Sequence, residues 1–106
     1  MTGEAETRLM IREQAFEDFS ERAQRRESVT SHYKDEDQES CSAAALLAGL
    51  RTTGRLFGYF IQDDRVHVIT GQETKMDIEA KFAELQVEKN VRDLQSRVSL
   101  RTAPAA

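Results

Sequence analysis

Residues 55–70 have the sequence RLFGYFIQDDRVHVIT, which predicts a β-hairpin. Aromatic and β-branched residues dominate both arms, as they do in strands. The arms are separated by Asp63 and Asp64, residues that are common in turns. On the expected core side, the pairs that face each other across the hairpin are Ile61 with Val66 and Tyr59 with Val68. The other face then carries Phe60 opposite His67.

Residues 75–100 follow the hairpin and predict a long helix. Thr74 and Asp77 have the spacing of a capping box, and residues 101–106 form a tail that is expected to fray. One apolar stripe runs along the whole helix in steps of three or four residues: Met76, Ala80, Ala83, Val87, Val91, Leu94 and Val98. A second apolar patch lies on the opposite side of the first half: Ile78, Phe82 and Leu85. A helix that is apolar on two sides is usually covered on both.

The N-terminal half of the chain predicts two more helices and a loop. Residues 4–26 predict a helix, because apolar side chains recur there at helical spacing and the last turn is basic. Residues 27–41 are polar and predict a loop, and the alternative is a solvated helix that starts near Ser31. Residues 42–50, SAAALLAGL, predict a short buried helix that Ser42 caps.

Together these elements predict a single domain of the α+β class. A two-stranded hairpin is marginally stable alone and needs helices to cover it. We therefore expect a small antiparallel sheet with the helices packed on one face. Gly58 lies beside Ile69 in the expected register, and a glycine within a strand indicates that another element approaches closely.

Size, charge and cysteine content limit the classes of protein to consider. The chain has 106 residues, a formal net charge of -4 and one cysteine, Cys41. One cysteine allows no intrachain disulfide, and the polar, acidic N-terminus is unlike a signal peptide. The apolar stretches are too short to span a bilayer. We therefore expect a cytoplasmic, intracellular protein with no membrane partner.

The sequence contains no pattern that is typical of a catalytic, metal or cofactor site. His32, His67 and Cys41 lack the paired spacing of zinc ligands. The acidic run that begins at Asp35 lacks the glycine and the glutamate that a calcium loop needs at its sixth and twelfth positions. We therefore expect no catalytic residues, no metal and no cofactor, and hence no enzyme.

The long helix carries the functional prediction. A helix of this length spans about 39 Å, whereas a compact domain of this size has a radius of gyration near about 13 Å. Its second half is therefore expected to project and to need a partner. This predicts a non-enzymatic protein–protein interaction module, namely an adaptor, an inhibitor or an assembly subunit, that forms a homodimer or binds another protein.

The residues expected at this interface are Val87, Val91, Leu94 and Val98, with Phe60 and His67 on the outer sheet face in a lesser role. An equally weighted alternative is that the N-terminal helix covers the stripe within the same chain.

A small DNA- or RNA-binding regulator that dimerises through the same helix is the alternative function. Its phosphate contacts would be Arg22, Arg25, Arg26, Arg51, Arg55 and Arg65. The net charge and the acidic segment oppose this function, because nucleic-acid binding depends largely on neutralising phosphates. Steep salt-dependent retention on heparin or DNA resin would distinguish it from a protein-binding module.

Overall fold

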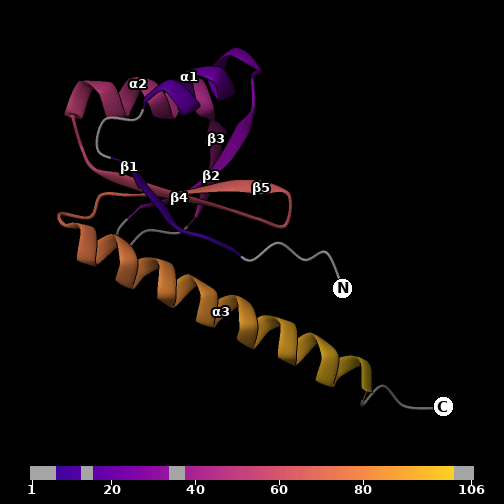
Figure 1. Ribbon diagram of the computed structural model, residues 1–106. Coiled ribbons are helices and arrows are strands. Elements are labelled where there is room, and N and C mark those ends of the chain that lie inside the picture. Colours follow the sequence, from indigo (N-terminus) through magenta and orange to yellow (C-terminus); the bar gives the residue numbers. More distant parts are fainter. Residues whose placement is uncertain (1–6, 13–15, 34–37, 102–106) are drawn as a thin grey trace.

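The computed structural model describes residues 7–12, 16–33 and 38–101, with the backbone alone at residues 12, 16 and 98–101. Within these residues, one sheet lies between helices on its two faces (Figure 1). The elements in chain order are β1 (Met10–Arg12), α1 (Phe16–Gln24), β2 (Ser28–Tyr33), β3 (Glu39–Ser42), α2 (Ala43–Thr53), β4 (Phe57–Gln62), β5 (Arg65–Thr70) and α3 (Lys75–Arg101).

β4 and β5 form the predicted hairpin, and its register is confirmed. The paired residues are Tyr59 with Val68, Phe60 with His67, Ile61 with Val66 and Gln62 with Arg65. Asp63 and Asp64 have φ angles of 55° and 60°, as a type I′ turn requires, and aspartate tolerates this left-handed conformation. Ile61, predicted on the core side, is 48% exposed beside this turn.

The α+β class is confirmed, but the sheet is larger than expected and has helices on both faces. Its strand order is β1-β4-β5-β2-β3, and it is mixed because β2 runs parallel to β5. α1 and α2 cover one face and α3 covers the other (Figure 1). The physical reason is that the hairpin is apolar on both sides, so a single layer of helices would leave one apolar face in water.

The first core lies between the sheet and the pair α1 and α2. Phe19 of α1 is fully buried. Its ring meets the rings of Phe57 and Tyr59 edge to face, with centroids 5.1 and 5.3 Å apart. Leu47 and Leu50 of α2 complete this core. The edge-to-face contacts fix α1 over β4, since aromatic pairs prefer this geometry.

The second core lies between the sheet and α3. Phe60 and Ile69, from the opposite side of the hairpin, pack with Ile78 and Phe82 of the helix. Gly58 allows α3 to come close, because a Cβ atom at this position would lie 2.6 Å from Cγ2 of Ile78. The close approach predicted at Gly58 is therefore confirmed, and α3 is the element that makes it.

Local hydrogen bonds define where α2 and α3 begin and end. The Oγ of Ser42 accepts a hydrogen bond of 3.1 Å from the backbone N–H of Ala45, as predicted for an N-cap. Gly54, with φ of 64°, ends α2 three residues later than the predicted end at residue 50. Thr74 and Asp77 form the predicted capping box, in which each backbone N–H donates to the other side chain over 3.1 Å.

The helix predicted over residues 4–26 is wrong in the first part that the structure describes. Residues 10–12 form β1, and α1 begins only at Phe16. Met10 pairs with Tyr59 and packs against the first core, whereas Ile11 pairs with Gly58 and packs against the second. Successive side chains on opposite faces are the pattern of a strand. Residues 4–6 and 13–15 of this prediction lie outside the described ranges.

The loop predicted over residues 27–41 is also wrong, because this segment contains β2 and most of β3. Val29 is fully buried, and the polar residues Thr30 and His32 are buried too. β2 lies between β5 and β3, so the backbone groups on both of its edges are paired. Val29 lies in the first core, and His32 lies beside His67 on the other face. The alternative helix from Ser31 is excluded by the same pairing, and residues 34–37 are not described.

Candidate functional site

The long apolar stripe of α3 faces away from the sheet, and the short patch on the opposite side holds the helix in place. Ile78 is fully buried, and Phe82 and Leu85 are half-buried against the sheet. The large stripe residues whose side chains are described are exposed: Met76 by 77%, Val87 by 60%, Val91 by 47% and Leu94 by 61%. The side chain of Val98 lies outside the described atoms.

The stripe stays open within the described part of the chain because α1 is on the far face of the sheet (Figure 1). The alternative in which the first helix covers the stripe is therefore wrong for these residues. The second half of α3 extends beyond the sheet, as its length predicts, and gives the molecule extents of 57 × 29 × 28 Å. The radius of gyration, 16.1 Å, exceeds the value of about 13 Å that a compact domain of this size would have.

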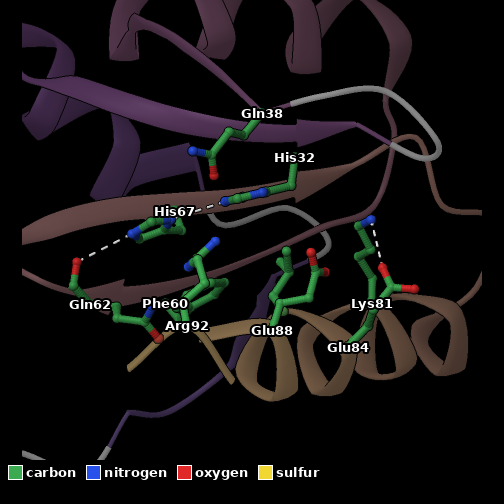
Figure 2. Close-up of a pocket in the computed structure, with 10 residues that line it drawn as sticks. His32, Gln38, Phe60, Gln62, His67, Lys81, Glu84, Glu88 and Arg92 are labelled. Carbon is green, nitrogen blue, oxygen red and sulfur yellow. Dashed lines mark hydrogen bonds and ion pairs between the residues drawn. The ribbon is translucent and has the colours of Figure 1, made fainter. Parts of the chain in front are cut away.

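A cavity of about 740 Å³ lies between α3 and the sheet (Figure 2). Its sheet side is lined by His32, Phe60, Gln62 and His67, and Gln38 lies at its edge. Its helix side is lined by Lys81, Glu84, Leu85, Glu88 and Arg92. The cavity therefore combines a floor of aromatic rings with side chains of both charges.

The two histidines of the chain meet in this cavity. Nε2 of His32 lies 3.0 Å from Nδ1 of His67, and Nε2 of His67 lies 3.2 Å from the carbonyl oxygen of Gln62 (Figure 2). A carbonyl oxygen only accepts, so Nε2 of His67 carries a proton and donates it to Gln62. Nδ1 of a neutral His67 then accepts from the Nε2–H of His32. His32 of β2 therefore donates to His67 of β5, and His67 donates to the carbonyl oxygen of Gln62 in β4.

Burial keeps both imidazoles neutral. Desolvation is the main cause that lowers the pKa of His32 to about 4, and the charges of His67 and Lys81 lower it further. Desolvation also lowers the pKa of His67, against the opposing effects of its bond to Gln62 and of the charge of Asp63. Two neutral rings are what these two hydrogen bonds require.

Metal or thiol chemistry would depend on the described side chains in and around this cavity. Within the described residues, no three His, Cys, Asp or Glu side chains come together as a metal site requires. The hydrogen bond between His32 and His67 uses the lone pair on Nδ1 of His67, so that nitrogen is not free to bind a metal ion. The pKa of the Cys41 thiol is raised, first by burial and then by Glu39, which disfavours the reactive thiolate.

The six arginines of the nucleic-acid alternative are spread over three places in the described fold. Arg22, Arg25 and Arg26 lie at the end of α1, Arg51 and Arg55 near the end of α2, and Arg65 at the start of β5. The first two both form ion pairs with Glu27, at 2.9 and 2.8 Å. Arg51 donates to Oγ of Ser20 and Arg65 to Oγ of Ser40, at 3.0 and 3.4 Å. Four of the six are therefore engaged by neighbouring side chains.

Both sheet residues predicted at an interface, Phe60 and His67, lie on the face of the sheet that α3 covers. Phe60 is 1% exposed under α3 and lies 5.0 Å from the ring of Phe82. His67 stacks on Phe60, with ring centroids 4.8 Å apart, and is held by His32 and Gln62. The sequence does not predict His32 as a site residue, and the one signal for it is that the chain has only two histidines.

Comparison of the chain with protein-family models, with curated proteins and with solved structures finds no match. Among the helices of the described residues, none combines the length and the apolar character that crossing a membrane requires. The function is therefore inferred from the surface and the chemistry of this chain alone.

Proposed function

We propose that the protein is a non-enzymatic protein–protein interaction module that forms a homodimer through the exposed stripe of α3. The interface residues of this proposal are Val87, Val91, Leu94 and Val98. The observation that supports it is a row of large aliphatic side chains that stays in water over the projecting half of the helix. Contiguous exposed apolar surface of this kind is typical of interaction sites.

The contacts of α3 support a role for the stripe outside the protomer. A helix needs one apolar face to pack on its own sheet, and α3 meets that need with Ile78, Phe82 and Leu85. The stripe adds nothing to that packing, because it lies on the other side of the helix. Burying an exposed valine or leucine side chain is favourable. Full burial of one such side chain stabilises by roughly 1.5–3 kcal/mol relative to leaving it in water.

The proposal excludes Phe60 and His67 from the interface, since both are already engaged beneath α3. It also excludes the cavity as a catalytic centre. The two histidines are kept neutral and use their facing nitrogens in bonds to each other and to the backbone. No activated nucleophile accompanies them among the described residues.

Charge introduced into the stripe tests the proposal. The wild-type protein is expected to have the mass of a dimer by light scattering at micromolar concentrations, and Val91→Asp and Leu94→Asp are expected to be monomers. Ser96→Asp is the matched control, because Ser96 is exposed on the same segment and lies on the side opposite the stripe. Circular dichroism verifies that each variant is folded. A wild-type protein that stays monomeric, or aspartate variants that remain dimeric, would disprove the proposal.

A further inference from the structure

We infer that two copies of α3 pair antiparallel, with the two-fold axis of the dimer at Val87. This inference rests on the proposed self-association and specifies its geometry. It follows from the symmetry of the stripe, the sizes of its side chains and the charges beside it.

The stripe is symmetric about Val87 in the sequence. Its members lie in pairs at four, seven and eleven residues on either side of this valine: Ala83 and Val91, Ala80 and Leu94, Met76 and Val98. In an antiparallel pair, a two-fold axis brings residues that are equally far from the axis to the same level. Val87 then contacts the partner's Val87, and Ala83 contacts the partner's Val91.

The sizes of the side chains favour the antiparallel arrangement. The first half of the stripe contains alanines and the second half contains branched residues, so Ala80 would lie level with the partner's Leu94. Each of these levels then holds one small and one large side chain, which keeps the two helix axes evenly spaced. A parallel pair would place Ala80 and Ala83 against their own copies. Val91 and Leu94 would likewise lie against theirs, so the helix axes would be unevenly spaced.

The spacing of the stripe allows contact along its full length. Val87 is eleven residues after Met76, and the same interval separates Ala80 from Val91 and Ala83 from Leu94. An eleven-residue repeat corresponds to about 3.67 residues per turn, close to the 3.6 of an α-helix. The stripe therefore runs almost straight, over about 33 Å from residue 76 to residue 98.

One pair of opposite charges beside the stripe also fits the antiparallel pair. Glu79 and Arg97 are both exposed, and the eighteen residues between them are five helical turns, so they lie on the same flank of the stripe. In the inferred register, Glu79 lies about 3 Å along the axis from the level of the partner's Arg97. A parallel pair would instead leave Glu79 about 27 Å along the axis from the partner's Arg97. Exposed ion pairs are weak, so this contact selects orientation more than affinity.

The position of the sheet is compatible with this pairing. The sheet packs on the side of α3 opposite the stripe, so the two domain bodies would lie on the outer sides of the helix pair. The projecting second half of each helix would lie against the first half of the other. The exposed residues Val91 and Leu94 would thus lie level with the partner's Ala83 and Ala80.

Single cysteines in a Cys41→Ser background test the geometry. Val87→Cys is expected to form a disulfide-linked dimer on mild oxidation, because the two thiols face each other across the axis. Ala80→Cys alone and Leu94→Cys alone are expected to give little dimer, because each residue and its copy are about 21 Å apart. An equimolar mixture of Ala80→Cys and Leu94→Cys is expected to give a mixed disulfide dimer.

The outcomes separate this inference from the proposed function. If light scattering shows a dimer but Ala80→Cys and Leu94→Cys each cross-link with themselves as well as Val87→Cys does, the pair is parallel and the inference is overturned while the function remains. A dimer in which Val87→Cys does not cross-link overturns the position of the axis. A protein that is monomeric by light scattering overturns the proposed function itself.

Charge reversal gives an independent measurement. Glu79→Arg is expected to weaken dimerisation roughly tenfold, because an ion pair becomes a repulsion at both ends of the interface. The double variant Glu79→Arg/Arg97→Glu is expected to recover most of the wild-type affinity, since the pairs are restored with reversed sign. A double variant that dimerises as weakly as Glu79→Arg would contradict the antiparallel register.

Discussion

His32 and His67 share a hydrogen bond of 3.0 Å that joins two parallel strands beneath α3. The bond needs one proton and one lone pair between Nε2 of His32 and Nδ1 of His67. If both rings were fully protonated, two N–H groups would point at each other beside the cationic Lys81. The pairing of β2 with β5 is therefore coupled to the protonation of these two histidines.

Acidification is expected to destabilise the fold through these histidines. Both have a lower pKa in the folded state than the ordinary value of 6.5, and that of His32 is about 4. Between these values the unfolded chain binds more protons than the folded protein. The stabilisation is therefore complete above pH 6.5 and is lost as the pH falls towards 4.

Urea unfolding of wild type and His32→Gln at several pH values measures this effect. The wild-type protein is expected to lose on the order of 2 kcal/mol more than the variant between pH 7 and pH 4.5. Carboxylates titrate in both proteins and His67 is retained in the variant, so the difference isolates the contribution of His32. Equal losses in the two proteins would show that His32 does not couple stability to pH.

Gly58→Ala is expected to destabilise the protein by about 1–3 kcal/mol, because the new methyl group would collide with Ile78 where α3 comes close to β4. The change should be smaller in an Ile78→Ala background, which a double-mutant cycle by urea unfolding would measure. Gly49→Ala is the control. It adds the same methyl group to a helix position with open space around it, so it should stabilise by up to about 1 kcal/mol. Equal effects of the two substitutions would contradict the close approach.

Thr74→Ala is expected to lower the free energy of unfolding by about 1 kcal/mol, because the backbone N–H of Asp77 loses its acceptor at the start of α3. Thr74→Ser retains the hydroxyl and should remain close to wild type. Thermal unfolding followed by circular dichroism compares the three proteins. A serine variant as unstable as the alanine variant would show that the hydroxyl is not the stabilising group.

Binding to heparin or DNA resin is expected to be weak and to be lost at low salt. Arg22 and Arg25 share an ion pair with Glu27, which offsets one of their two charges, and the chain carries a net charge of -4. Glu27→Gln removes that neutralisation and should move elution to a slightly higher salt concentration. Wild-type retention that persists to high salt would instead favour the nucleic-acid function.

Elements with their own local signals were predictable. The hairpin register follows from a two-residue turn between alternating apolar arms, and the start of α3 follows from the spacing of Thr74 and Asp77. These signals lie within a few residues of one another. The same holds for the cap that Ser42 provides to α2.

The edge and interior strands at the N-terminal side were not predictable in this way. Met10 and Ile11 were consistent with a helix until pairing with β4 placed their side chains on opposite faces. The sequence SVTSHY of β2 is polar, and Val29, Thr30 and His32 are buried because β2 is an interior strand between β5 and β3. The contact between His32 and His67 depends on that same pairing.

By itself, the sequence determined the α+β class, the hairpin and the long helix with two apolar sides, because those properties depend on neighbours in the chain. Only the tertiary structure decided which side of α3 packs and which stays exposed, and that the two histidines meet. Both outcomes depend on strands that are far apart in sequence and pair side by side, and the free energy of such pairing belongs to the assembled sheet rather than to any one segment.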